Sequence, residues 1–268
     1  LLDDAWCEFF KQNNFLVGLS LDGDKDIHDA NRVDARGNGT YSRVLKAARL
    51  LEKHNVDNNI LCVVTRELAR RGKRVYHELF KLGFRYLQFI PCIDDFGAAP
   101  GSSPYSLTAG RFGQFLKDLF DEWYMDFMAG QYVSIRHFDN WVHMLQGLPP
   151  ETCSMSGRCT CYGVVEADGS VYSCDFYVLD QWKLGNIREQ SLEDLLTCDL
   201  AQKFVMDSLP LAEKCRNCRH YSICRGGCRR DREPLDPEKV ALNIYCEAYE
   251  QFFDYALDRL RQVARIAR

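Results

Sequence analysis

The sequence has no long apolar run and no long basic run. No window of its 268 residues approaches the roughly 18 consecutive apolar residues of a membrane-spanning helix. The formal net charge is −4, and no stretch of lysine or arginine is long enough to follow a phosphate backbone. The chain also does not open with a charged segment followed by an apolar one, as an export signal does. We therefore expect a cytoplasmic protein with neither a membrane nor nucleic acid as a partner.

Cysteine, by contrast, is abundant and concentrated. Nine of the thirteen cysteines lie between residues 153 and 246. Their density exceeds what an intracellular globular domain uses for packing, which indicates thiolates that hold metal. The nine are Cys153, Cys159, Cys161, Cys174, Cys215, Cys218, Cys224, Cys228 and Cys246.

Three kinds of thiol site compete for this pattern. Disulfide frameworks suit small secreted domains, whereas this chain is 46% hydrophobic and long enough to bury a core without cross-links. Zinc and iron–sulfur clusters both accept four cysteines, and the C-x2-C pair Cys215 and Cys218 can place two sulfurs on either. Cysteine spacing alone does not distinguish a zinc site from an iron–sulfur cluster.

The first half of the chain alternates between helical and extended patterns. Short apolar runs predict strands over 15–20, 60–65 and 86–90, and apolar residues at helical spacing separate them. Alternation of this kind predicts a parallel sheet with covering helices. A long amphipathic helix follows over 107–127, with its aromatic residues in the core. The pair Pro149-Pro150 then breaks the chain, so we expect domains 1–150 and 151–268.

The second half begins with a predicted hairpin. Asp168-Gly169 stands between alternating residues, which is a strong hairpin signal and places Cys174 on the returning strand. Neighbouring side chains on a strand face opposite ways, so Asp175 should point away from any metal that Cys174 binds. It is either a base or a capping aspartate, and the residues alone favour the cap. Ser191 caps a further predicted helix, and the final helix, over 245–260, should pack back on the first domain.

Ligands in such folds gather at the carboxyl ends of parallel strands. Ser20 and Asp22 end the first predicted strand, and Arg32 follows soon after. His28 lies between them, and we expect it to pin this loop by hydrogen bonds. Ile93 follows the third strand. The remaining cysteines, which fall within apolar patterns and are expected to be buried small hydrophobes, are Cys7, Cys62, Cys92 and Cys198; of these, Cys92 also has the position of a thiol lining the cavity.

The cysteine pattern, with the run Cys224-Arg-Gly-Gly-Cys228 and the hairpin before Cys174, resembles the SPASM auxiliary-cluster domain of radical S-adenosylmethionine enzymes. The whole chain is similar to the anaerobic sulfatase-maturating enzymes of that superfamily. The resemblance implies an α/β fold, in which the C-terminal half of a partial (β/α)6 TIM-like barrel precedes a small SPASM domain with a β-hairpin and helices. The first three barrel strands would lie upstream of Leu1.

The resemblance also implies roles for single residues. Asp175 would be the catalytic base, and Ser20, Arg32 and Ile93 would bind the cofactor. One auxiliary [4Fe–4S] cluster would be held by Cys153, Cys159, Cys174 and Cys228, and a second by Cys215, Cys218, Cys224 and Cys246. Cys161 has no role in this assignment.

In family members, a radical made from S-adenosylmethionine removes a hydrogen from a cysteine or serine of a sulfatase peptide, and the product is formylglycine. The implied partners are an unfolded or nascent sulfatase peptide and an electron donor such as flavodoxin or ferredoxin. The C-x3-C-x2-C loop that holds a third [4Fe–4S] cluster and the cofactor is missing here. We expect it upstream of Leu1, and we expect the chain alone to be inactive.

Two other functions fit the same residues. One is a peptide-modifying enzyme of the same superfamily that forms thioether or carbon–carbon crosslinks. The other is a zinc-binding interaction module that only resembles the auxiliary domain. Iron and sulfide content separates the second from both enzymes.

Overall fold

The computed structural model describes residues 2–99, 101–233 and 240–267. The chain forms two compact units, one of Leu1–Val142 with Glu247–Arg268 and the other of His143–Cys246. These units are defined by contacts within the chain. The predicted domains, 1–150 and 151–268, stay a prediction. Each unit is described by itself.

The first unit contains a parallel sheet of four strands in the order β1-β2-β3-β4. A parallel pair needs a crossover between its strands, and a helix supplies each one here: α3 (Tyr41–Lys53), α4 (Gly72–Lys81) and α5 (Ala109–Met128). The three predicted strands and the α/β class are confirmed. That the sheet is half of a six-unit barrel stays a prediction. The strands are β1 (Val17–Ser20), β2 (Asn58–Val64), β3 (Tyr86–Pro91) and β4 (Ser134–Ile135).

Further elements of this unit flank the sheet. The helix α1 (Asp4–Gln12) precedes β1, and α2 (Lys25–Asn31) follows it. The 3-10 turn η1 (Leu68–Arg71) leads into α4. The helix α6 (Arg136–Leu145) starts directly after β4, and α12 (Cys246–Ile266) ends the chain. No helix among the described residues is both long and apolar enough to cross a membrane.

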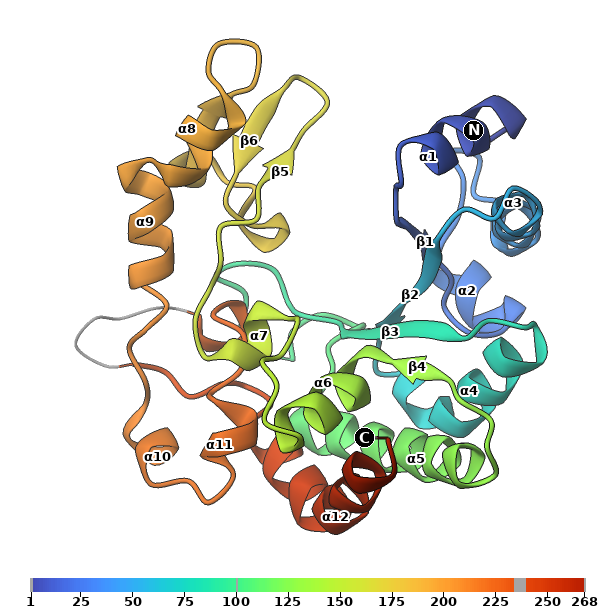
Figure 1. Ribbon diagram of the computed structural model, residues 1–268, viewed down its shortest axis with the longest axis vertical. Coiled ribbons are helices and arrows are strands. Elements are labelled where there is room, and N and C mark those ends of the chain that lie inside the picture. The colour runs from blue at the N-terminus through green and yellow to red at the C-terminus, as the bar shows by residue number, and fades with distance from the viewer. Residues whose placement is uncertain (1, 100, 234–239, 268) are drawn as a thin grey trace. The chain divides into compact units, whose positions relative to one another are not determined.

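An aromatic core joins α5, α6 and α12. The ring centroids of Phe120 and Phe138 lie 5.3 Å apart, and those of Trp141 and Phe252 lie 4.8 Å apart. All four side chains are buried, and burying each phenylalanine contributes roughly 1.5–3 kcal/mol to folding. Figure 1 shows α5 and α12 side by side. The prediction that the final helix packs on the first domain is therefore confirmed.

The second unit is built from short elements. Three strands form an antiparallel sheet in the order β5-β6-β7, and Figure 1 shows the β5–β6 hairpin beside α8. Its elements are α7 (Cys153–Ser156), β5 (Val164–Val165), β6 (Ser170–Tyr172), η2 (Asp175–Tyr177), η3 (Asp180–Trp182), β7 (Lys183–Asn186), α8 (Leu192–Thr197), α9 (Asp199–Met206), α10 (Glu213–Arg216), α11 (Tyr221–Cys224) and η4 (Arg230–Arg232).

Local sequence signals in this unit are mostly confirmed. The hairpin forms at Asp168-Gly169, where Gly169 takes a φ of +87° that side chains rarely adopt. The Ser191 hydroxyl accepts a hydrogen bond from the Asp194 amide at 3.1 Å, as expected of a helix cap. The apolar face from Leu192 to Phe204 predicts one helix here, but the extended backbone of Cys198 divides it into α8 and α9.

The close approach of α5 and α12 yields a stability prediction. A Cβ atom added at Gly113 would lie 3.2 Å from the Ala248 Cα, whereas one added at Gly110 would meet nothing within 4 Å. Because the backbone of α12 cannot yield as a side chain can, we expect Gly113→Val to lower the free energy of unfolding by about 1–3 kcal/mol more than Gly110→Val does. Anaerobic urea denaturation measures both.

The Gly110→Val variant is the matched control, since it places the same β-branched residue in the same helix. Equal stability of the two variants would show that α12 does not pack against Gly113 as described.

Candidate functional site

Two of the predicted cofactor-binding residues lie at the carboxyl end of the first strand. Ser20 is the last residue of β1, and Arg32 follows the end of α2. The Arg32 Nε donates to the Asp22 Oδ2 at 2.5 Å, and its Nη2 donates to Oδ1 at 3.3 Å. Asp22 is buried and also accepts a hydrogen bond from the Val63 amide at 2.8 Å. A buried carboxylate tied to β2 thus fixes a partly exposed guanidinium beside the strand ends.

His28 holds the same loop, as predicted. Its Nδ1 accepts a hydrogen bond from the Asp22 amide at 3.2 Å, which leaves the ring proton on Nε2. Nε2 lies 3.1 Å from the Thr40 hydroxyl oxygen, which in turn donates to the Arg32 carbonyl. Burial lowers the pKa of His28, so that the ring stays neutral. The histidine therefore positions the loop.

Ile93, the third predicted cofactor contact, follows β3 and is half-buried. Its neighbour Cys92 is tied to the sheet by the hydrogen bond from its amide to the Val64 carbonyl, at 3.0 Å. Cys92 and Cys198 are only partly buried, whereas the other two cysteines expected in the core, Cys7 and Cys62, are fully buried.

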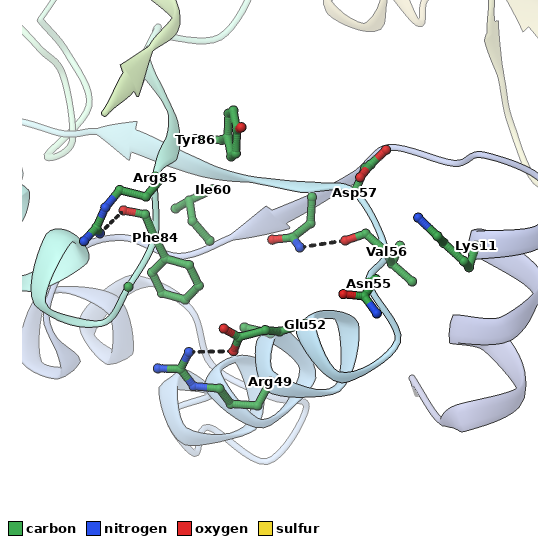
Figure 2. Close-up of a pocket in the computed structure, with 13 residues that line it drawn as sticks. Lys11, Arg49, Glu52, Asn55, Val56, Asp57, Ile60, Phe84, Arg85 and Tyr86 are labelled. Atoms are coloured by element: carbon green, nitrogen blue, oxygen red, sulfur yellow. Dashed lines mark hydrogen bonds and ion pairs between the residues drawn. The ribbon is translucent and has the colours of Figure 1, made fainter. Parts of the chain in front are cut away.

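A cavity of about 450 Å³ opens at the other end of the strands (Figure 2). Asn58 and Tyr86, the first residues of β2 and β3, line it. Figure 2 shows that two of its cations are engaged within the protein, since Arg49 pairs with Glu52 and Arg85 donates to a backbone carbonyl. None of the predicted site residues lines this cavity. It lies at the amino ends of the strands, where such folds do not place their chemistry.

The second unit brings the first predicted set of thiols together. Burial raises the pKa of Cys228 well above its usual range, and Cys159 and Cys153 are close enough to raise it further. Burial also raises the pKa of Cys174 to about 12. Cys174 and Cys159 share one apolar cluster with the side chains of Tyr177, Trp182 and Phe204.

The second predicted set is likewise gathered in one place. Burial raises the pKa of Cys224 to about 11, and the neighbouring thiols of Cys215, Cys246 and Cys218 add to the rise. The same two neighbours, Cys246 and Cys218, raise the pKa of Cys215. Cys161 is coupled instead to Cys198, apart from both sets. Among the described residues, no three histidine, cysteine or acidic side chains converge on a single metal ion.

Two buried arginines, Arg229 and Arg232, indicate what kind of group the first set of thiols could hold. The guanidinium of Arg229 lies 4.7–4.9 Å from the ring centroids of Phe204, Trp182 and Tyr177, which belong to the apolar cluster of Cys159 and Cys174. The carboxylates that pair with it among the described residues are those of Asp207, at 3.9 Å, and Glu233, at 4.0 Å. The Nε atoms of Arg229 and Arg232 are buried without a hydrogen-bond partner in the described chain.

These observations fit an anionic metal cluster. Both arginines act on the Cys159 thiol so as to lower its pKa, against the larger effect of burial. Buried cations need a compensating charge, and thiols must lose their protons when they bind metal. A cluster held by the first thiol set supplies negative charge beside both arginines. Neither arginine was singled out from the sequence, because the rings around Arg229 come from three separate segments.

Asp175 departs from the predicted geometry. The backbone leaves the extended conformation after Cys174 and enters the 3-10 turn η2, so the alternation of side chains stops there. The carboxylate consequently turns back toward Cys174, and its Oδ1 lies 3.3 Å from the Cys174 Sγ. The expectation that Asp175 points away from Cys174 is wrong for this reason.

The two carboxylate oxygens of Asp175 are not equivalent. Oδ1 accepts hydrogen bonds from the Phe176 amide at 3.0 Å and from the Tyr162 hydroxyl. Oδ2 accepts none from the described residues, and the side chain is exposed. One oxygen is therefore fixed while the other is available to a substrate.

Tyr162 is a site residue that sequence reasoning missed. Burial and the hydrogen bond to Asp175 raise the pKa of Tyr162, so the phenol keeps the proton that it donates. The hairpin carried a signal for it, because Val164 pairs with Tyr172. Continuing that register by two residues sets Tyr162 opposite Cys174.

Comparisons with known proteins show the family of this chain. A family model described as SPASM, an iron–sulfur cluster-binding domain, matches residues 153–219. The cysteine-type anaerobic sulfatase-maturating enzyme of Clostridium perfringens (strain 13 / Type A) is 45% identical over 98% of this chain and 71% of its own length. The serine-type enzyme of Bacteroides thetaiotaomicron is 32% identical over 95% of this chain and 65% of its own length.

Solved structures give the same result. The structure of native anSMEcpe with bound AdoMet and Cp18Cys peptide matches with a TM-score of 0.94 at 44% identity, over 100% of this chain and 74% of that one. Streptococcus suis SuiB, at 15% identity and a TM-score of 0.54, shares the fold alone over 92% of this chain and 57% of that one. The match to the cysteine-type relative extends over nearly the whole of this chain. The chain therefore belongs to the family of anaerobic sulfatase-maturating enzymes.

Proposed function

We propose that this protein oxidises a cysteine or serine side chain of a sulfatase peptide to formylglycine, in a reaction that S-adenosylmethionine starts. The observation that carries the proposal is the Asp175 carboxylate, which lies beside Cys174 with one oxygen fixed and the other free. Membership of the family supports it. Both cysteine-type and serine-type relatives match, so the proposal includes either target residue.

The chemistry divides between cofactors and protein. When bound, S-adenosylmethionine supplies the oxidant that removes a hydrogen atom from the substrate β-carbon, and iron–sulfur clusters supply an acceptor for one electron. Loss of a hydrogen atom, a proton and an electron converts a CH₂–SH or CH₂–OH group into a carbon–sulfur or carbon–oxygen double bond. Water then replaces sulfur, which leaves as hydrogen sulfide, in the cysteine case.

Asp175 would accept the proton that the substrate thiol or hydroxyl loses. Its free Oδ2 is the oxygen that can reach a substrate thiol or hydroxyl, because Oδ1 is held by the Tyr162 hydroxyl and the Phe176 amide. An exposed carboxylate with one fixed oxygen presents a single, oriented acceptor. In the first unit, Ser20, Arg32 and Ile93 would contact S-adenosylmethionine.

The thiols would hold two auxiliary [4Fe–4S] clusters, one on Cys153, Cys159, Cys174 and Cys228 and the other on Cys215, Cys218, Cys224 and Cys246. The further partners in this proposal are an unfolded or nascent sulfatase peptide and a one-electron donor such as flavodoxin or ferredoxin. Thiolate ligands persist in reducing surroundings, in keeping with a cytoplasmic location.

The two thiol sets predict the iron content of the chain. After anaerobic reconstitution we expect about eight irons per chain, because four thiolates are available to each of two clusters. Cys153→Ala and Cys224→Ala should each remove about four irons, and the double variant nearly all of them. Iron and sulfide analysis with Mössbauer spectroscopy measures the loss.

Cys198→Ala is the control, since it removes a partly buried thiol that belongs to neither set. A chain that holds four irons, all lost from either single variant, would overturn the assignment of two clusters.

The role of Asp175 predicts the behaviour of Asp175→Asn in the anaerobically reconstituted protein. Asparagine keeps the shape of aspartate but cannot accept the proton, whereas hydrogen abstraction does not need that step. We expect 5′-deoxyadenosine to form still, while formylglycine falls by roughly 10²-fold or more, the usual scale for a positioned general base. Mass spectrometry of the peptide and chromatography of the nucleoside measure the two products.

Asp168→Asn serves as the control, because asparagine before glycine also suits the hairpin turn. That variant should keep both activities. A formylglycine yield from Asp175→Asn within a few-fold of the parental yield would remove Asp175 from the mechanism.

A further inference from the structure

The hydroxyl of Tyr162 contacts both residues of the Cys174-Asp175 pair. Its oxygen lies 3.4 Å from the Cys174 Sγ and accepts a hydrogen bond from the Asp175 amide at 3.0 Å. It also donates to the Asp175 Oδ1. Three contacts converge on this one hydroxyl, although the tyrosine side chain is 49% exposed and its ring is not part of the core.

The hairpin explains how Tyr162 reaches this position. β5 and β6 pair with Val164 opposite Tyr172, and the continuation of that register sets Tyr162 across from Cys174. The pairing itself ends at Val164, and Gly163 before it takes a φ of +74°, so Tyr162 stands just outside the paired strands. Asp175 itself lies in a short 3-10 turn, which does not restrict the rotation of its carboxylate.

The Asp175 carboxylate beside the Cys174 sulfur needs a hydrogen-bond donor. When Cys174 binds metal it loses its proton, and its Sγ can then no longer donate to the Asp175 Oδ1, 3.3 Å away. Two acceptors then lie within contact distance of each other. Apart from the Phe176 amide, the Tyr162 hydroxyl is the only donor among the described residues that reaches Oδ1.

We propose that Tyr162 is a positioning residue, which holds Oδ1 of Asp175 against the sulfur of Cys174 and so directs Oδ2 to the substrate. The inference rests on the proposed role of Asp175 as the base. Tyr162 therefore acts on the reaction through the orientation of the base.

Tyr162→Phe in the intact protein tests this role, because it removes the hydroxyl and keeps the ring. We expect unchanged iron content and a kcat for formylglycine that is lower by roughly tenfold, as for the loss of one hydrogen bond to a charged group. The KM for the peptide should stay within about twofold, and more 5′-deoxyadenosine should form per formylglycine.

Tyr255→Phe is the matched control. Tyr255 is 45% exposed, and its hydroxyl also donates to an aspartate, Asp121, at 2.8 Å, but in the first unit. This variant should keep the parental kcat and product ratio.

A double variant separates this inference from the proposed function. If Tyr162 acts through Asp175, then Tyr162→Phe should cost little in an Asp175→Asn background, since no base is left to orient. Additive losses would overturn the positioning role, as would a parental kcat or loss of iron in Tyr162→Phe. A parental yield from Asp175→Asn alone would instead overturn the role of the base itself.

Discussion

The second unit depends on cysteine thiols that are wholly or partly buried. Its regular elements are too short to supply a large core, since its strands span two to four residues and several helices span four. Burial raises the pKa of Cys174 to about 12 and of Cys224 to about 11, so these thiols are neutral without iron. Metal binding exchanges those protons for bonds that tie distant segments together. The free energy of cluster binding is then in large part the free energy of folding of this unit.

The two units use aspartate in opposite ways. Asp22 is buried, and both of its oxygens accept hydrogen bonds from the protein, so it serves to hold Arg32 and β2 in place. Asp175 is exposed, and only one of its oxygens is engaged. A carboxylate whose hydrogen bonds are all made within the protein is a scaffold, whereas one with a free oxygen is available for chemistry. The count of hydrogen bonds therefore separates the two roles where residue type does not.

Much of this architecture was readable from sequence because the signals were local. Strands β1, β2 and β3 appear as apolar runs, and Asp168-Gly169 identifies the hairpin. Strand β4 was not predicted, since two residues carry no periodicity. The grouping of thiols came from resemblance, and the structure brings most members of each set together.

The parts that sequence did not reveal depend on contacts between distant segments or on a local change of backbone. The cage around Arg229 needs Tyr177, Trp182 and Phe204, which no spacing rule connects. The direction of Asp175 was predicted wrongly, because nothing in the sequence announces that the chain enters a 3-10 turn at that residue. To identify Tyr162, one must know which residues of the hairpin lie opposite each other. A turn signal alone does not predict that register to the exact residue.

The division of the chain also sets the order of events on the ribosome. The helix α12 follows every cysteine of the second unit but Cys246, its own first residue, yet Phe252 on it packs against Trp141 and Phe138 of the first unit. The first unit therefore cannot complete its aromatic core until all the cysteines of the second have emerged from the exit tunnel.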